Sequence, residues 1–489
     1  LATTWGSAMA ARHYGPRETH TFEQSPGCVV HQAPRFTDLL SQAAAHGQSL
    51  EDGAVLSLAL PLAPLDPLQA LPQLPGGDRF RALWDSQPGL CFAATGVSQQ
   101  LELSGPRRFE LAQRFCQLSL SRLQDAAPEA PALARPRVLL AFSFFDAPLF
   151  EAAEPLPGVR AVLPRWQLSR QGRQCWLRLS RSLGGEITPR LVAEELWEQA
   201  RLLTQAEPPA PPQAIPRLLS RSPWHGAYRQ AMDQALHLVG ENELRKLVLA
   251  VRQQLQLEAP LDPQLLLKGL RQRHRGSCRF LWGLADGGDL VGASPERLLA
   301  VRQGHLRCDA LAGTASQHQP PEQLLHSSKD RHEHELVVEA ITAVLQQQGL
   351  SPRQPRHPRL ASHGPLHHLH TPITASLAGQ DPLALAAALH PTPAVAGLPR
   401  REAMAWLRQL EPFERGAYAA PIGWIDSAGD AELRVAIRSG VLRGSRLELT
   451  AGAGLVKGSV PERELQEVAL KLEVLQQQLT VSPAVTAAG

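Results

Sequence analysis

The feature that most constrains the fold of this chain is a succession of short apolar runs with few helical segments between them. Val138–Phe145 is a candidate buried strand, and Val162–Leu168 and Cys175–Leu179 flank the polar sequence RQGRQ as the two strands of a hairpin do. Strands that follow one another without an intervening helix favour antiparallel or mixed sheets. The pattern therefore predicts an α+β fold with large, mainly antiparallel sheets rather than a doubly wound parallel fold.

A proline-rich polar segment, Thr204–Arg217, is the strongest candidate for a linker. The chain has 489 residues, enough for one large domain or for two to three ordinary ones. We expect a divergent N-terminal part over residues 1–215, a catalytic domain over residues 216–482 and a disordered tail over residues 483–489.

Local patterns in the first half of the chain give further predictions. Pro61–Asp78 contains five prolines and two glycines and is predicted to be a loop. Cys91–Val97 and Leu101–Leu103 are predicted to pair as a hairpin. Helices are predicted over Pro106–Leu123, Leu191–Leu203 and His225–Val239.

The composition argues against several classes of partner. The formal net charge is +3 and 19% of residues are charged, which is too balanced for a nucleic-acid-binding face. The six cysteines are scattered without a CxxC pair, so they indicate free thiols in a reducing compartment, and we expect a cytoplasmic protein. No apolar run is long enough to span a membrane, and the first residues lack the pattern of a secretory signal.

The closing segment Leu449–Lys471 has the pattern of a strand, a glycine turn and a helix. Gly452 and Gly454 would form the turn, in which backbone N–H groups can approach an anion closely. Ser459 would cap the helix, with Glu462 completing a capping box.

This predicted helix carries Glu464, Glu467 and Lys471 at positions i, i+3 and i+7, so the three side chains share one face. Two carboxylates and an ammonium beside a glycine turn suit a small polyanion bound with a metal ion. A solvated helix face is the ordinary alternative.

One residue on a predicted strand and one just after a strand have the chemistry of a base and an acid. Lys246 shares a strand face with Val248 and Ala250, and burial there would favour a neutral, proton-accepting amine. The alternative is a lysine that extends to water. Glu296 follows a strand and could be a general acid if its surroundings raise its pKa. The alternative is a carboxylate at the start of a helix.

A second group of candidates surrounds the helix predicted over Ser328–Ile341. Gly313 and Thr314 follow a strand and offer another glycine turn with a hydroxyl. Glu333 can face inwards, where it would need a cation, although a surface ion pair with Lys329 is also possible. The HExxH spacing of zinc proteases is absent, but the histidines of His363–His370 leave zinc binding open.

Arg438 is predicted to lie on a strand that pairs with Arg446–Thr450, sharing a face with Arg434 and Ala436. A guanidinium in that position could clamp a carboxylate through two hydrogen bonds. A solvated strand arginine is the ordinary alternative.

Nine segments in order make a more specific pattern than any of these residues alone. The sequence resembles the chorismate-utilising enzymes, and most closely the isochorismate synthases, over about Lys246–Leu472. A weaker similarity extends back to Val138. The segments are KLVLA, GASPERLL, LAGTAS, SSKDRHEHELV, HLHTPI, LHPTPAVAGLPR, EPFERGAYAAPIGWID, LRVAIRSG, and AGAGLV with SVPERELQEVALK.

The resemblance implies an α/β/β/α sandwich of two large, mainly antiparallel sheets, into which residues 1–215 also pack. It implies that Lys246 activates water as general base and that Glu296 protonates the leaving hydroxyl. Glu333 and Glu467 would hold Mg²⁺, with Glu464 in a supporting position. The substrate-binding positions would be Gly313, Thr314, His368, Arg438, Gly452, Gly454 and Lys471.

The implied reaction is the Mg²⁺-dependent isomerisation of chorismate to isochorismate for quinone biosynthesis. Lys246 at the base position suits water as nucleophile, so no amidotransferase partner is expected, and the protein would be a monomer or a homodimer. A salicylate synthase, which also eliminates pyruvate, is the main alternative. An aminating relative such as anthranilate synthase component I is less compatible, because LHPTPAVAGLPR departs from the corresponding segment of those enzymes.

Overall fold

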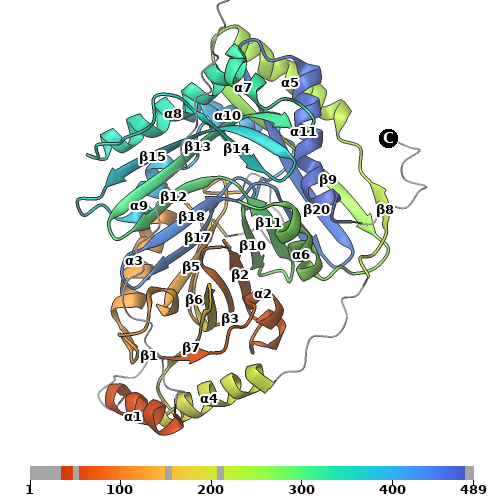
Figure 1. Ribbon diagram of the computed structural model, residues 1–489. Coiled ribbons are helices and arrows are strands. Elements are labelled where there is room, and N and C mark those ends of the chain that lie inside the picture. The colour runs from red at the N-terminus through yellow and green to blue at the C-terminus, as the bar shows by residue number, and fades with distance from the viewer. Residues whose placement is uncertain (1–34, 48–53, 87, 149–156, 206–213, 480–489) are drawn as a thin grey trace, which may run out of the picture.

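The computed structural model describes residues 35–47, 54–86, 88–148, 157–205 and 214–479 (Figure 1). Its strands belong to one continuous hydrogen-bonded system, and the pairings between them are antiparallel apart from that of β1 with β4. The predicted class, an α+β fold with large, mainly antiparallel sheets, is therefore confirmed.

The first part of the chain carries mostly strands. Its elements are α1 (Phe36–Gly47), β1 (Val55–Leu62), α2 (Pro67–Ala70), β2 (Arg81–Asp85), β3 (Cys91–Leu103), α3 (Arg108–Ser121), β4 (Leu123–Asp125), β5 (Arg137–Phe142), β6 (Val159–Gln171), β7 (Gln174–Ser182) and α4 (Pro189–Gln205).

The second part mixes strands with longer helices. Its elements are β8 (Leu218–Arg221), α5 (His225–Gly240), β9 (Lys246–Leu257), α6 (Pro263–Arg273), β10 (Cys278–Gly283), β11 (Asp289–Ser294), β12 (Arg297–Arg302), β13 (His305–Ser316), α7 (Glu322–His326), α8 (Ser328–Gln347), β14 (Arg359–His363), β15 (Leu366–Ser376), α9 (Pro382–Leu389), β16 (Gly397–Leu398), α10 (Arg400–Leu410), β17 (Pro421–Asp426), β18 (Ala431–Val435), β19 (Ser439–Arg443), β20 (Arg446–Val456) and α11 (Pro461–Gln476).

The hydrogen bonds connect these strands in a long ladder that folds back on itself. Its order is β14–β15–β13–β12–β18–β17–β5–β6–β3–β2–β10–β11–β19–β20–β9, with β7, β1 and β4 branching from β6. Strands β13 and β20 lie far apart along this ladder, yet residues of both line the same cavity. The fold thus brings together two walls that come from distant parts of the ladder.

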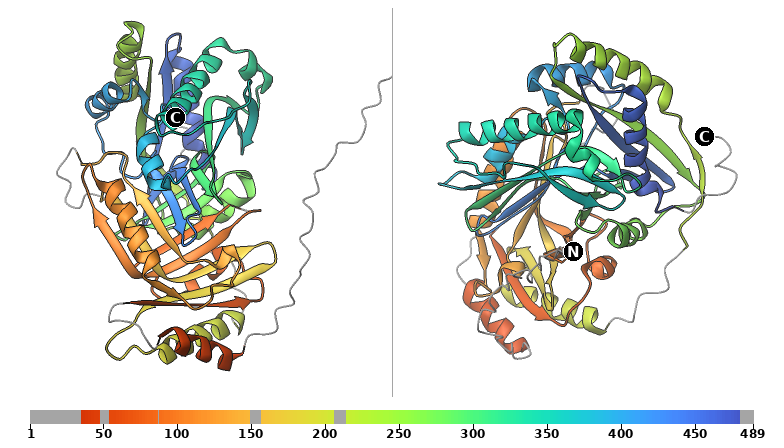
Figure 2. Two further views of the ribbon diagram at one scale, coloured as in Figure 1. Left: turned by 90° about the vertical axis from the view of Figure 1, so that its left-hand side faces the viewer. Right: turned by 45° about the horizontal axis from the view of Figure 1, so that its top comes forward.

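Helices cover the outer faces of the ladder. Helix α8 packs on β13 and β15, while α11 and α5 pack on β20 and β9, all at the upper end in Figure 1. Helices α1 and α4 lie side by side against β1 and its neighbours at the opposite end, as Figure 2 also shows. The side chains between these layers form a large buried core.

The two predicted parts of the chain share this ladder. Strand β2 pairs with β10 and β5 pairs with β17, so strands from before residue 215 hydrogen-bond to strands after it. Aromatic side chains pack where they meet, including Phe80 against Trp282 at a ring-centroid distance of 5.0 Å. The domain limits given from the sequence remain a prediction.

Two predictions in the first part are wrong in detail. Pro61–Asp78 is not simply a loop, because Asp66 accepts a hydrogen bond from the Leu68 N–H and starts the short helix α2. Cys91–Val97 and Leu101–Leu103 do not pair with each other. They belong to the single strand β3, which pairs with β2 and β6 and has a register shift between Val97 and Gln99. The predicted β6–β7 hairpin and the helices α3, α4 and α5 are present.

The closing segment also differs from its prediction. Gly452 and Gly454 lie inside the continuous strand β20, so they form no turn. Helix α11 has Val460 as its N-cap residue without a side-chain cap, and Ser459 instead accepts a hydrogen bond from the Val456 N–H. Glu462 is exposed and pairs with Arg229.

Some predictions fall outside the described residues. These are most of the linker, the tail over residues 483–489, the first residues of the chain and Cys28. The other five cysteines are buried and free. Within the described ranges, no helix is both long enough and apolar enough to cross a membrane.

Candidate active site

The candidate residues converge on one cavity between β13, β20 and the inward faces of α8 and α11. Ten of the twelve line it directly: Glu296, Gly313, Thr314, Glu333, His368, Arg438, Gly452, Gly454, Glu467 and Lys471. The other two flank it. Lys246 contacts Glu333 behind the wall, and Glu464 lines the adjoining hollow over the start of α8. Segments 225 residues apart in the chain, from Lys246 to Lys471, thus meet at one place.

Lys246 and Glu333 form a buried ion pair at this site. The Lys246 Nζ lies 3.0 Å from Glu333 Oε1, and the Lys246 side chain is only 1% exposed. Burial by itself would raise the pKa of Glu333. The charges of Lys246 and Lys329 together outweigh this effect, so the net pKa falls below its usual value. The predicted burial of Lys246 is confirmed, while its carboxylate partner was not anticipated.

The glycine at position 454 makes this pair possible. A Cβ on Gly454 would lie 2.3 Å from Glu333 Oε1 and 2.9 Å from the Lys246 Cε. Neither distance leaves room for a carbon atom. Gly454 therefore serves close approach of side chains within a strand rather than a turn.

Glu296 is held at the tight connection between β11 and β12. Its backbone N–H donates to Ser294 Oγ at 3.2 Å, and that hydroxyl donates to the Val435 carbonyl at 2.6 Å. Strand β12 follows directly, so the alternative of a helix-starting carboxylate is wrong. Burial raises the pKa of Glu296 to about 8, although Lys246 and Arg438 act in the opposite direction. This carboxyl group keeps its proton at neutral pH.

Arg438 presents a cation to the cavity from the junction of β18 and β19. Its backbone has a φ of +53°, which turns the chain between the two strands, so Arg434, Ala436 and Arg438 do not continue one strand face. Among the described residues, no carboxylate lies within 4.0 Å of its guanidinium. Arg434, in contrast, is paired with Glu432 at 2.6 Å.

His368 lies beside Arg438 in a fixed orientation. Its Nδ1 is 3.0 Å from the Gly313 carbonyl and therefore carries the proton, while its Nε2 is 3.5 Å from Arg438 Nη2. Burial, and next the charge of Arg438, lower the pKa of His368 well below its usual value, so the ring is neutral.

Lys471 and Glu467 form the other polar wall. The Lys471 Nζ lies 2.6 Å from Glu467 Oε1 and donates to the Gly452 carbonyl at 2.7 Å. Thr314 Oγ1 donates to the same Glu467 oxygen at 3.1 Å. Thr314 and its neighbour Gly313 lie within β13, where Gly313 has a φ of +72° at a register shift, so they form a bulge rather than a turn.

A cluster of carboxylates borders the cavity at the start of α8 and α11. Glu464 is 2% exposed, and its Oε2 atom is buried without a hydrogen-bond partner. Burial, followed by the charge of Glu467, raises the pKa of Glu464 to about 7. A carboxylate oxygen without a partner is the kind of ligand that Mg²⁺ prefers, so Glu464 offers one acceptor for that ion.

The histidines do not form a zinc site. Across the residues with described positions, no group of three or more His, Cys, Asp or Glu side chains is arranged to hold a metal ion. The carboxylates near the cavity are turned towards lysines as the structure stands. His334 bonds Thr371 Oγ1 at 2.8 Å, and His370 bonds Asp309 at 3.0 Å.

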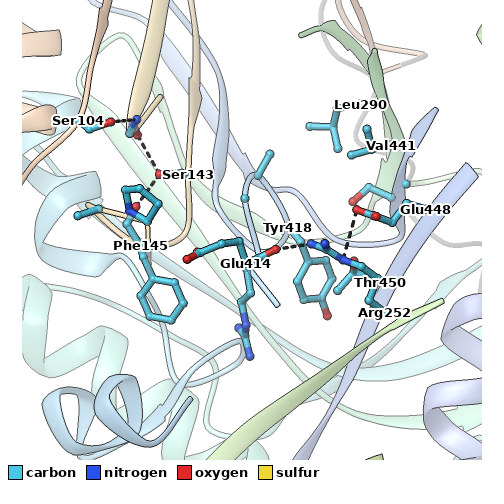
Figure 3. Close-up of a pocket in the computed structure, with 18 of the residues that line it drawn as sticks. Ser104, Ser143, Phe145, Arg252, Leu290, Glu414, Tyr418, Val441, Glu448 and Thr450 are labelled. Carbon is cyan, nitrogen blue, oxygen red and sulfur yellow. Dashed lines mark hydrogen bonds and ion pairs between the residues drawn. The ribbon is translucent and has the colours of Figure 1, made fainter. Parts of the chain in front are cut away.

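A larger hollow of about 240 Å³ adjoins the cavity through Tyr418 and Thr450, which line both (Figure 3). The three arginines that line it already have carboxylate partners, which are Glu448 for Arg252, Glu411 for Arg415 and Asp286 for Arg443. Figure 3 shows Arg252 between the Glu414 carbonyl and Glu448, whose Oε1 is 3.3 Å from Arg252 Nε. The unpaired cation and the protonated acid lie in the smaller cavity, which we therefore take as the reaction site.

Sequence reasoning missed three residues at this site. Tyr418 lies in the segment ERGAY and divides the two hollows, but a lone tyrosine gives no spacing signal. Lys329 was predicted only as a surface ion-pair partner of Glu333, whereas in the structure it contacts two buried glutamates. Asp330 packs against Gly313. Lys329 and Asp330 precede Glu333 by four and three residues, which places them on the same side of the helix. This spacing could have identified them from the sequence.

The fold and the cavity together define a small-molecule site between sheet walls that carry a carboxyl group with a raised pKa, a lysine and an arginine. The chain belongs to the chorismate binding enzyme family, which matches residues 39–480. The resemblance identified from the nine segments is thereby confirmed.

Two relatives and one solved structure show how far the similarity extends. The chain is 33% identical over 455 residues to the salicylate biosynthesis isochorismate synthase of Pseudomonas aeruginosa, covering 90% of this chain and 93% of that protein. It is 37% identical over 262 residues to isochorismate synthase EntC of Escherichia coli K12, covering 52% of this chain and 67% of EntC. The structure of MenF, the menaquinone-specific isochorismate synthase from Escherichia coli, aligns with a TM-score of 0.72 and 26% identity, covering 91% and 99% of the two chains.

Proposed function

We propose that the protein is an isochorismate synthase, which adds water to C2 of chorismate and expels the C4 hydroxyl. The observation that carries this proposal is Glu296, a buried carboxyl with a pKa raised to about 8, in a cavity also lined by Arg438 and Lys471. A carboxyl group that is still protonated at neutral pH can donate its proton to a poor leaving group. The hydroxyl then departs as water.

Substrate binding follows from the charges in the cavity. Chorismate carries two carboxylates, so its receptor needs more than one cation. Arg438 is available for a carboxylate, and the neutral His368 ring beside it leaves that charge uncompensated. Lys471, which is held by Glu467 and the Gly452 carbonyl, supplies a second cation.

Lys246 is the proposed general base that takes a proton from the attacking water. It lies on β9, whereas Glu296 lies on the connection between β11 and β12, so acid and base come from different strands. Its Nζ is held 3.0 Å from Glu333 Oε1, behind the wall of the cavity.

The proposed metal is Mg²⁺, which Glu333 and Glu467 would hold, with Glu464 in support. The metal would neutralise these carboxylates and bind a substrate carboxylate that they would otherwise repel. The buried Glu464 Oε2 atom, which has no partner, supports this assignment.

The product would supply a quinone-forming pathway, as the name of the menaquinone-specific relative suggests for that protein. The relative from Pseudomonas aeruginosa is named for salicylate biosynthesis, and a siderophore-type or salicylate route is therefore the alternative. Water as nucleophile requires no amidotransferase partner. A monomer or a homodimer in the cytoplasm is the expected state.

The test is to incubate the purified protein with chorismate and Mg²⁺ and to separate the products by chromatography. Isochorismate as the only product supports the proposal, and salicylate with pyruvate supports the alternative. Anthranilate or an aminated intermediate formed with ammonium would assign an aminating enzyme. Absence of chorismate turnover with both water and ammonium as nucleophile would refute the proposal.

A further inference from the structure

Lys329, in the first turn of α8, extends its ammonium into the carboxylate cluster. The Lys329 Nζ lies 3.1 Å from Glu464 Oε1, 3.3 Å from Glu333 Oε2 and 3.8 Å from Asp330 Oδ1. Its side chain is 23% exposed, while those of Glu333 and Glu464 are 8% and 3% exposed. Among the described residues, this ammonium is therefore the one that contacts both buried carboxylates.

This compensation is incomplete. The ammonium reaches only one oxygen of Glu464, and the second, Oε2, is buried without a partner. Two of the carboxylates have other lysines as well, Glu333 through Lys246 and Glu467 through Lys471. The cluster thus has four carboxylates, with Asp330 included, and three ammonium groups. A divalent cation would satisfy it better than the single charge of Lys329.

An ammonium group and a metal ion cannot both occupy this place. Mg²⁺ lies about 2.0–2.1 Å from its oxygen ligands, closer than the Lys329 Nζ lies to the same carboxylates. An ion bound between Glu333 Oε2 and Glu464 Oε1, the two oxygens that Lys329 contacts, would take the place of the ammonium, and their like charges would repel. A hollow of about 340 Å³, lined by Lys329 itself and by Gln319, Gln323 and Arg463, offers the side chain room to swing out.

We propose that Lys329 is the built-in counter-ion of the metal-free site and that Mg²⁺ binds only by displacing its ammonium from Glu333 and Glu464. This inference rests on the proposed function, because it assumes that the carboxylates hold a metal. Lys329 then lowers the affinity for Mg²⁺ and prevents the buried carboxylates from repelling one another when no metal is bound. Metal binding and the movement of this side chain become one event.

The first test compares Mg²⁺ binding to the substrate-free protein by isothermal titration calorimetry. Lys329→Met, which keeps the length of the side chain without its charge, is expected to bind Mg²⁺ at least fivefold more tightly than the wild type. Metal-free Lys329→Met should also melt several degrees lower and regain this loss when Mg²⁺ is added. Lys457→Met, at an exposed lysine between β20 and α11, is the matched control and should behave as the wild type.

Unchanged or weaker Mg²⁺ binding by Lys329→Met would overturn the inference. A wild-type protein that binds no Mg²⁺, with or without chorismate, would instead refute the proposed metal. If Lys329→Met does not fold, the wild type gives an independent measurement. Its Lys329 should react severalfold faster with an amine-acylating reagent when Mg²⁺ is present, as measured by mass spectrometry of the peptides. Labelling that does not increase would count against displacement.

Discussion

At the scale of single residues, Glu296 makes the reaction dependent on pH. Its pKa is raised to about 8, so the fraction of protonated acid falls as the pH rises through this value. We expect kcat/KM for chorismate to decrease above about pH 8, with a slope that approaches one decade per pH unit. Steady-state rates between pH 6 and 10, at saturating Mg²⁺, test this expectation. A flat profile between pH 7 and 9.5 would remove Glu296 from the role of acid.

The matched variant Glu296→Gln separates the catalytic role from stability. We expect it to reduce kcat by roughly 10²–10⁴-fold, the usual contribution of a general acid. The raised pKa of Glu296 also means that its contribution to stability is full below the ordinary pKa of 4.5 and is lost as the pH rises towards 8. Thermal unfolding at pH 9 should therefore show Glu296→Gln to be more stable than the wild type.

Arg438 gives a second prediction at this scale. Because its guanidinium faces the cavity without a carboxylate partner, Arg438→Gln should lose a charged hydrogen-bonded contact with the substrate, about 1.5–3 kcal/mol. We expect KM for chorismate to rise roughly 10- to 100-fold, with a smaller change in kcat. Arg443→Gln is the control, since Arg443 pairs with Asp286 outside the cavity. Equal effects of the two substitutions would show that Arg438 has no special role in binding.

At the scale of elements, strand β20 must pass close to the Lys246–Glu333 pair. Gly454→Ala would place a carbon atom 2.3 Å from Glu333 Oε1, so the pair must shift. We expect turnover to fall roughly 100-fold, since small misplacements of reacting groups have costs of this size. Gly226→Ala is the control, because a Cβ at that position of α5 meets nothing within 4 Å. Normal activity of Gly454→Ala would mean that the backbone of β20 moves and leaves the ion pair in place.

The glycines of the site show why part of it was predictable from the sequence and part was not. Strand or helix type and the identity of Lys246, Glu296 and Glu333 could be read from apolar patterns and motifs. The roles of Gly313 and Gly454 could not, because a glycine in a bulge or under a close contact has the same letter as one in a turn. Nor does the pattern around Lys246 show a carboxylate from a helix more than eighty residues later.

At the scale of the whole molecule, the ladder predicts that residues 214–479 do not form a stable unit alone. Removing the preceding strands would expose the edges of β10 and β17, which pair with β2 and β5. It would also remove Phe80 from the aromatic cluster and so expose its partner Trp282. We expect this fragment to aggregate or to lack a cooperative thermal transition in circular dichroism. A soluble, active fragment would contradict the prediction and would support the domain limit set from the sequence.

The continuity of the ladder has a further consequence for how this enzyme tolerates change. The walls formed by β13 and β20 are connected through every strand between them, and each strand adds its own small rotation to the next. The width of the cavity therefore depends on the twist summed over these strands as well as on the contacts that span it, such as that between Thr314 and Glu467. Substitutions in β3 or β6, far from any substrate atom, can alter substrate affinity by small increments. Directed evolution of the site thus has a much larger set of useful positions than the residues that line it.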